Sequence, residues 1–262
     1  MQLGFLTAGT VEDVAFAARH GFGCLELALF GDTPLFADHR DFAAALRDAA
    51  LPLAAVSLFG QNYRDPAPAR RQKALDRLER AADLAAALGA PVFVTGTGAD
   101  PGRPEEQQWD EAAEEMAPRV AAIQRRGLHF AFYNCHWANV MLTPAAWQSI
   151  LPRIPGAGLK FDPSHPAYAG RDWMPELLAA GPALLHAHAK DVLRVGDRIV
   201  ADPNPGLGQI AWGPFFALLY EAGYGGAVCI EPHSRLYTGE ARERFLLLSQ
   251  RHLTQFLVPE PS

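Results

Sequence analysis

Short apolar runs alternate with longer amphipathic stretches along the chain, and this alternation occurs eight times. Near-continuous apolar runs are typical of parallel strands that are buried on both faces, whereas the longer stretches have the spacing of surface helices. The expected strands are Leu3–Thr7, Cys24–Leu29, Leu53–Leu58, Val92–Thr95, Leu128–Tyr133, Gly158–Phe161, Leu184–Ala189 and Ala227–Ile230. The expected helices are Val11–Arg19, Phe42–Ala50, Arg70–Leu88, Pro104–Arg126, Pro144–Leu151, Pro175–Ala180, Pro214–Glu221 and Glu240–Phe256. Strict alternation of this kind predicts βαβ units and a parallel sheet.

Residues at the boundaries support these elements. Thr10 precedes an expected helix with acidic residues in its first turn, as an N-cap does. Gly21, Gly89, Gly127 and Gly223 each follow an expected helix, where a glycine with positive φ can end it. Eight βα units in 262 residues predict a single-domain (β/α)8 TIM barrel over residues 1–262. A doubly wound open sheet is the alternative, but no GxGxxG follows the first expected strand.

Composition narrows the class of protein. Hydrophobic residues make up 49% of the chain and charged residues 20%, which suffices for a large core. The net charge of −6 argues against a nucleic-acid partner. Cys24, Cys135 and Cys229 lack CxxC spacing, and we expect reduced thiols. With neither a secretory signal nor a run of about 18 apolar residues, we expect a cytoplasmic protein without a membrane partner.

Polar side chains follow the last four expected strands. In a (β/α)8 barrel the carboxyl ends of the strands carry the chemistry, and neighbouring strands aim their end residues at one rim. Any one such residue is more often structural than functional, so the concurrence on four adjacent strands carries the argument. Carboxylate, imidazole and amide oxygen together suit one divalent ion such as Mn²⁺, Mg²⁺, Co²⁺ or Zn²⁺. The residues concerned are Asn134, His136, Trp137, Asp162, His165, His188, Lys190 and Glu231.

Four short motifs occur in order along the second half of the chain. They are Asp162-x-x-His165, His188-x-Lys190-Asp191, the six-residue step from His188 to Arg194, and Gly223-Tyr-x-Gly226 before Ile230-Glu231. In this order they resemble the sugar phosphate isomerase/epimerase superfamily of xylose isomerase-like TIM barrels. The resemblance extends over essentially the whole chain and implies an enzyme of carbohydrate metabolism.

The resemblance also implies a metal site. Family members usually hold one divalent metal ion with residues at the ends of strands five to eight, which here are Asn134, Asp162, His188 and Glu231. Asn134 is a departure, because the family commonly has Glu at that position. An amide offers a carbonyl oxygen but no titratable proton near neutral pH, so Asn134 is not a base. With one anionic ligand fewer, metal affinity should be weak.

The expected reaction is isomerisation or epimerisation of a small sugar, sugar phosphate or inositol-type polyol through an enediolate. The resemblance assigns catalysis to Glu231, His165 and Lys190, and substrate binding to His136, Trp137, Arg194 and His165. Lys190 also has a structural interpretation, as the ion-pair partner of Asp191 or Glu231.

Epimerases of this family use two carboxylates on opposite faces of the substrate, and here only Glu231 is in place. Glu26, His136 and His165 are candidate substitutes. The missing second carboxylate favours a lyase or dehydratase acting on a keto-sugar or keto-glycoside as the second alternative. A non-catalytic barrel that binds such a ligand is the third alternative. The nuclease branch of the superfamily is disfavoured, because its additional metal-binding histidines are missing. The sequence does not decide whether the protein forms a homo-oligomer.

The segment from Asp191 to Trp212 is long for a connection in a barrel, and it contains a hairpin-like Val195-Gly-Asp-Arg198 turn. Long loops in barrels are more often functional than incidental. Family members place a similar segment over the pocket, so the resemblance implies that this segment covers part of it.

Overall fold

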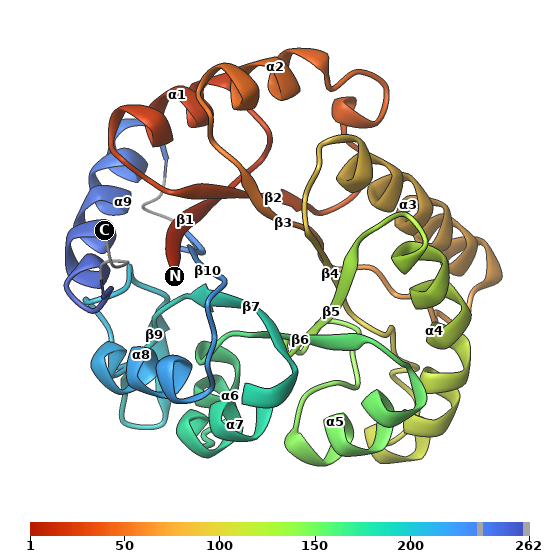
Figure 1. Ribbon diagram of the computed structural model, residues 1–262. Helices are drawn as coiled ribbons and strands as arrows, with labels where there is room; N and C mark the ends of the chain where they lie inside the picture. The colour runs from red at the N-terminus through yellow and green to blue at the C-terminus, as the bar shows by residue number, and fades with distance from the viewer. Residues whose placement is uncertain (235–237, 259–262) are drawn as a thin grey trace.

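The computed structural model describes residues 1–234 and 238–258, which form a closed barrel of parallel strands inside a ring of helices (Figure 1). The strands follow one another around the barrel in chain order, and β10 closes it by pairing with both β7 and β1. The barrel strands are β1 (Gln2–Thr7), β2 (Cys24–Leu29), β3 (Leu53–Leu58), β4 (Val92–Thr95), β5 (His129–Tyr133), β6 (Ala157–Phe161), β7 (Leu184–Ala189) and β10 (Ala227–Ile230). The (β/α)8 fold predicted from the sequence is confirmed.

Helices lie outside the barrel, between successive strands. They are α1 (Val11–Arg19), α2 (Arg40–Asp48), α3 (Pro68–Ala87), α4 (Trp109–Gln124), α5 (Pro144–Ile150), α6 (Ser164–Tyr168), α7 (Trp173–Ala180), α8 (Trp212–Glu221) and α9 (Gly239–Thr254). Thr10 caps α1 by accepting the Asp13 N–H at 3.2 Å. The four glycines expected to end helices all have positive φ, between 66° and 83°.

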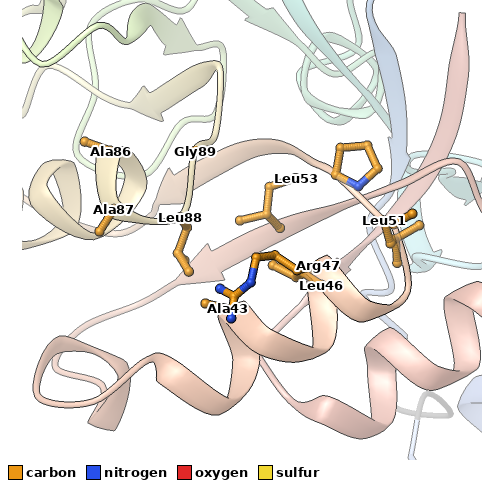
Figure 2. A pocket seen from close by; sticks show the side chains of 11 residues that line it. Ala43, Leu46, Arg47, Leu51, Leu53, Ala86, Ala87, Leu88 and Gly89 are labelled. Atoms are coloured by element: carbon orange, nitrogen blue, oxygen red, sulfur yellow. The ribbon is translucent and has the colours of Figure 1, made fainter.

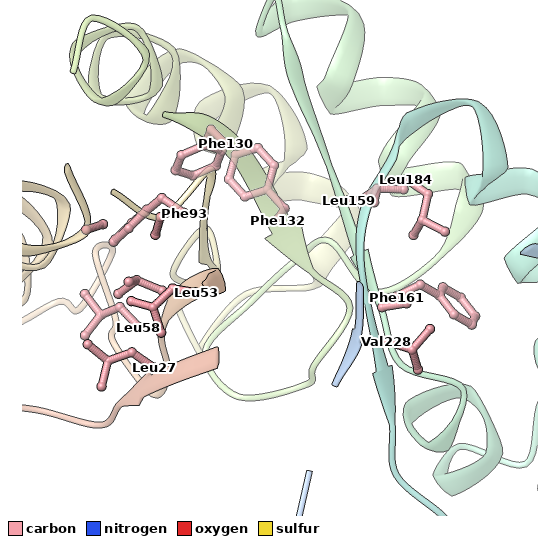
Figure 3. Close-up of a cluster of buried hydrophobic side chains, with 14 of the residues drawn as sticks. Leu27, Leu53, Leu58, Phe93, Phe130, Phe132, Leu159, Phe161, Leu184 and Val228 are labelled. Atoms are coloured by element: carbon pink, nitrogen blue, oxygen red, sulfur yellow. The ribbon is translucent and has the colours of Figure 1, made fainter. Parts of the chain in front are cut away.

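Alternate side chains of each strand face opposite sides of the barrel wall, as the two-residue period of a strand requires. On β2, Leu25 and Leu27 pack in the large core that the strands share with the helices, part of which Figure 3 shows. Cys24 instead belongs to a smaller cluster inside the barrel. Residues two apart on one strand therefore share a face, and this places Glu26 of β2 inside the barrel.

Several helix starts differ from expectation, and the differences include two additional short elements. Residues 104–126 hold a short 3₁₀ turn, Glu105–Gln108, before α4 rather than one helix. There the Gln108 side chain bonds backbone groups of Asp100 and Arg103, which fixes a bend. In addition, the short helix α6 follows β6 directly.

The first and last helices meet beside the closure of the barrel (Figure 1). Arg242 of α9 forms two hydrogen bonds to Asp13 of α1, at 2.6 and 3.2 Å, and Asp13 also accepts the Thr7 hydroxyl. Within residues 1–234 and 238–258, no helix combines the length and apolarity needed to span a membrane.

Candidate active site

A chain of buried charged side chains crosses the barrel interior. The Glu26 carboxylate lies 2.6 Å from His186 Nε2 and 2.8 Å from His188 Nε2, and it accepts the Ser57 hydroxyl at 2.5 Å. On its other side, His188 Nδ1 lies 2.8 Å from Glu231. Both ring nitrogens of His188 therefore face carboxylates, which favours the doubly protonated imidazolium.

Electrostatics in this chain follow from the competition between burial and opposite charge. Burial alone would raise the pKa of Glu26, but the two histidines outweigh it and hold this pKa well below its usual value. Burial works against the charge of His188, yet Glu26 and Glu231 raise the pKa of this imidazole. The pKa of His186 is lowered by burial, so His188 is the imidazole that carries the charge.

Two lysine ammonium groups stand beside the Asp162 carboxylate at the end of β6. Lys160 Nζ lies 3.5 Å and Lys190 Nζ 3.4 Å from Asp162 Oδ2, and Lys190 Nζ is also 3.4 Å from Glu231 Oε1. Asp162 Oδ1 accepts the Ser164 N–H and hydroxyl. Burial opposes the charge of Lys190, but Asp162 and Glu231 outweigh it and raise the pKa above its ordinary value. Lys190 therefore pairs with Asp162 and Glu231.

Asn134 is used by the backbone of the neighbouring strand end. Its Oδ1 accepts the Asp162 N–H at 3.0 Å, and its Nδ2 donates to the Asp162 carbonyl at 3.0 Å. This reciprocal pair fixes the end of β5 to the end of β6. The oxygen expected to ligate a metal is thus committed to a backbone hydrogen bond.

His165 is a neutral imidazole at the edge of the charged cluster. Burial and the nearby Lys190 charge lower the pKa of His165 well below its ordinary value. Its Nε2 lies 3.3 Å from Lys190 Nζ and 3.4 Å from Asp162 Oδ2. Its Nδ1 is buried and has no hydrogen-bond partner among the described residues. One ring nitrogen of His165 is thus unused by the described side chains.

Two cavities open at the carboxyl ends of the strands. One of about 310 Å³ is bordered by residues that include Asn134, His136 and His165. The other, of about 250 Å³, is bordered by residues that include Glu231 and His233. His136 is exposed at this rim. The half-buried Trp137 ring lies 6.1 Å from the His233 ring, so Trp137, expected to bind substrate, is at the rim.

The predicted hairpin after β7 consists of β8 (Leu193–Val195) and β9 (Arg198–Ala201). Arg194, expected near Glu231 or the substrate, instead donates to the carbonyls of Ala167 and Tyr168 and fastens the hairpin to α6. Just after β9, Asp202 accepts the Tyr168 hydroxyl at 2.6 Å and lies 3.0 Å from His233 Nδ1. The hairpin thus spans from α6 to the residues after β10.

The base of this segment is held by one carboxylate. Asp191 accepts hydrogen bonds from four backbone N–H groups and from the Trp212 indole N–H, at 2.9 to 3.1 Å; the backbone donors are Val192, Gly206, Gly208 and Ile210. Asp191 therefore organises the loop and does not pair with Lys190.

A larger cavity of about 640 Å³ lies elsewhere, at the opposite ends of the strands (Figure 2). It is bordered by Pro52 and Leu53, where β3 begins, and by α2 and the end of α3. Arg47 is the charged residue at its border, and no carboxylate or imidazole lines it. Its lining therefore offers no acid–base pair, and the candidate active site is the rim.

Three groups of side chains in the described ranges are close enough to hold a metal ion; they are Asp162–His188–Glu231, Glu26–His186–His188 and Cys135–His136–His165. In the first group the candidate ligand atoms lie within 4.8 Å of one another, and their chemistry suits a hard divalent cation. The surroundings do not suit it. Lys190 lies between the two carboxylates, and the Asn134 amide oxygen already accepts a backbone N–H. As arranged, these residues do not fit a divalent cation.

The fold and the rim cluster define a (β/α)8 barrel with a carboxylate–histidine site at the carboxyl ends of its strands. The profile of the family described as "Xylose isomerase-like TIM barrel" matches residues 14–250, and the chain belongs to this family. No curated protein matches the sequence.

Solved structures of sugar epimerases share the fold. D-psicose 3-epimerase from Clostridium cellulolyticum H10 superposes with a TM-score of 0.79 at 17% identity, covering 98% of this chain and 99% of that one. D-allulose 3-epimerase from Methylomonas sp. has a TM-score of 0.79 at 20% identity and covers 98% of both chains. For 3-keto-D-glucoside 4-epimerase from E. coli the TM-score is 0.77 at 17% identity, with 97% and 99% covered.

Sequence reasoning missed Lys160 and the role of Glu26. Lys160 stands two residues before Asp162 on β6, so the two-residue period of a strand could have placed both on the interior face. Glu26, one candidate for a second base, is fully buried and bonded to Ser57, His186 and His188. Its partners are distant in sequence, and no local pattern signals them.

Proposed function

We propose that the protein is an isomerase or epimerase of a small sugar, sugar phosphate or related polyol, and that Glu231 transfers the proton. The observation that carries this proposal is the position of Glu231. Asp162 and Glu26 are fully buried, whereas the Glu231 side chain is 12% exposed and borders the 250 Å³ cavity. Glu231 is thus the carboxylate of the cluster that a substrate can reach.

Glu231 acts as a general base on the carbon next to a carbonyl group. Burial would raise the pKa of Glu231, but Lys190 and His188 lower it well below its ordinary value, so the carboxylate is ionised. It takes a proton from the substrate carbon, leaving an enediolate, and returns the proton to the adjacent carbon in isomerisation. His165, which borders the neighbouring cavity, transfers the second proton, taking it from the substrate hydroxyl and giving it to the former carbonyl oxygen.

Metal dependence, which the sequence predicts, stays a prediction. Asp162, His188 and Glu231 are the residues that would hold the ion, and it would polarise the substrate oxygens. Lys190 and the committed amide of Asn134 count against it. The steps above use only side chains of the chain itself.

Asn134 favours a second candidate reaction, β-elimination of water or another substituent from a keto-sugar. The family position for the opposite carboxylate holds an amide here, and that amide is bonded to the Asp162 backbone. Elimination needs one base and one acid for the leaving group, which Glu231 and His165 can supply.

Proton exchange in D₂O tests the proposal. Wild type is incubated, after chelation and with Mn²⁺, with a panel of aldoses, ketoses, inososes and keto-glycosides, and NMR follows deuterium at the carbon next to the carbonyl. We expect exchange with at least one compound and a loss of about 10²–10⁴-fold in Glu231→Gln, because general base catalysis contributes that much. Glu240→Gln, an exposed carboxylate on α9, is the matched control and should be fully active.

The products distinguish the two reactions, since isomerisation retains every oxygen and elimination releases one substituent. If wild type exchanges no compound under either condition, the protein is a binding barrel and the proposal is wrong. Equal activity of Glu231→Gln and wild type would remove Glu231 from the reaction.

A further inference from the structure

The ammonium group of Lys190 lies at the centre of three polar groups contributed by separate segments. Its Nζ is 3.4 Å from Asp162 Oδ2, 3.4 Å from Glu231 Oε1 and 3.3 Å from His165 Nε2. Asp162 follows β6, His165 lies in α6 and Glu231 follows β10. A single positive charge is thus surrounded by two carboxylate oxygens and an imidazole nitrogen, which are ligand types that a divalent cation takes.

We infer that Lys190 occupies the cation position of this site, and that the wild-type protein consequently excludes a divalent metal ion. A metal bound by Asp162 and Glu231 must approach their oxygens to about 2.0–2.6 Å. The Lys190 ammonium group already lies against the same two oxygens, so the lysine and a metal compete for one place. If the lysine stayed beside a bound metal, two positive charges would meet in a buried site.

The lysine is held in this place from several sides. Its side chain is 2% exposed, and Nζ lies 5.5 Å from the centre of the Tyr168 ring. The next residue, Asp191, fixes the backbone through its five hydrogen bonds to the loop. Displacing Lys190 would therefore disturb the segment after β7.

Two ammonium groups already stand beside Asp162 without a metal. Lys190 Nζ lies 3.4 Å and Lys160 Nζ 3.5 Å from Asp162 Oδ2. A divalent ion at the same oxygen would add positive charge beside both lysines, away from water, which is unfavourable.

The consequence for catalysis rests on the proposed function. With Lys190 in the cation position, its ammonium group supplies the positive charge beside Glu231 that stabilises an enediolate oxygen. Metal exclusion itself is measured without substrate, so its failure would leave the isomerase proposal standing.

The test is a metal titration of chelator-treated protein, with Mn²⁺ and Zn²⁺ followed by calorimetry and by thermal shift. We compare wild type, Lys190→Met, the double variant Lys190→Met/Glu231→Gln, and Lys73→Met, which removes an exposed lysine of α3. We expect no saturable binding in wild type or Lys73→Met. Lys190→Met should bind one ion per chain, at least about 10²-fold more tightly than any binding detected in wild type, because a positive charge within about 4 Å of the ion is gone. The double variant should lose that gain with its ligand.

Lys190→Met leaves two buried carboxylates without their partner, so its folding is measured with and without Mn²⁺. Lys190→Arg keeps the charge; it should fold and still bind no metal. The inference is overturned if purified wild type carries one ion per chain, or if wild type binds metal as tightly as Lys190→Met. Unchanged tight binding in the double variant would place the ion elsewhere and overturn it as well.

Discussion

Glu26 is the residue on which the interior charge network depends. It is 0% exposed, and Ser57, His186 and His188 all approach its two carboxylate oxygens. A buried carboxylate is stable only when such partners compensate for lost hydration. By holding Nε2 of His188, Glu26 directs Nδ1 of that ring to Glu231. It is thus a positioning residue for the proposed base.

Replacing Glu26 with Gln should destabilise the protein by about 3–5 kcal/mol, because it leaves the His188 charge without a buried partner. Urea unfolding at pH 7 measures this. Glu240→Gln, at an exposed pair with Arg244, should change the free energy of unfolding by less than about 1 kcal/mol. Equal values for the two variants would show that Glu26 stabilises nothing.

The same variant should alter the pH dependence of stability. The native pKa of Glu26 is depressed below its ordinary 4.5, so its contribution is present above that pH and is lost as the pH falls below it. The native pKa of His188 is raised above 6.5, so its contribution is present below that pH and is lost as the pH rises through the raised value. In Glu26→Gln, unfolding free energies measured from pH 4 to 8 should vary less on both sides.

For single residues, the sequence could place side chains at the strand ends but could not identify their interaction partners. Asp162, His188 and Glu231 do converge at the rim, as the barrel topology requires. Whether Lys190 would pair with Asp191 or Glu231 depends on side-chain direction. Alternation along β7 turns Lys190 inward and Asp191 outward, and tertiary contacts then decide the rest.

At the scale of elements, the conformation of the segment after β7 depends on one side chain, Asp191. Asp191 gathers the backbone of residues 192–210 around one carboxylate, and Gly208 passes so close that a Cβ there would overlap Asp191 Oδ1. Because only glycine fits this approach, the loop conformation depends on position 208. Sequence showed the length of the segment and its turn, but not this anchor.

Gly208→Ala should therefore loosen the hairpin. Overpacking of this kind costs about 1–3 kcal/mol, so trypsin cleavage after the exposed Arg198 should accelerate about 10-fold or more through local opening. Limited proteolysis with mass spectrometry of the fragments measures it. Gly225→Ala is the control, because a Cβ there meets nothing within 4 Å. Cleavage rates that stay at the wild-type value would contradict the anchor.

Strand ends were predicted to within about a residue, whereas six of the eight expected helix starts were displaced, by one to five residues. The apolar runs of strands end sharply where the chain leaves the wall, so their limits are visible in sequence. Helix starts depend on caps and 3₁₀ turns: at α4, the Gln108 side chain binds loop backbone and delays the helix to Trp109.

For the whole molecule, closure joins the two ends of the chain. β1 pairs with β10, and the Arg242–Asp13 pair joins α9 to α1 beside that seam. These contacts are among the most distant in sequence, so folding must close a loop of most of the chain to form them. Periodicity predicts that the barrel closes but not which side chains fasten it.

Removing the Arg242–Asp13 pair should lower the free energy of unfolding of the whole protein. Arg242→Met breaks two charged hydrogen bonds to the partly buried Asp13, and we expect a loss of about 1.5–3 kcal/mol in urea unfolding. Arg244→Met, two residues further on, breaks a pair whose side chains are 80% and 87% exposed and should cost less than about 1 kcal/mol. Equal losses would mean that closure does not depend on Arg242.

The burial of the interior charge chain makes it insensitive to dissolved ions. Exposed pairs such as Arg40–Asp38 are weakened by salt, since the screening length falls to about 3 Å at 1 M ionic strength. Counterions cannot enter between Glu26, His188 and Asp162, all of which are 0% exposed. The part of the field at Glu231 that comes from these buried groups is therefore the same in dilute buffer and in concentrated salt.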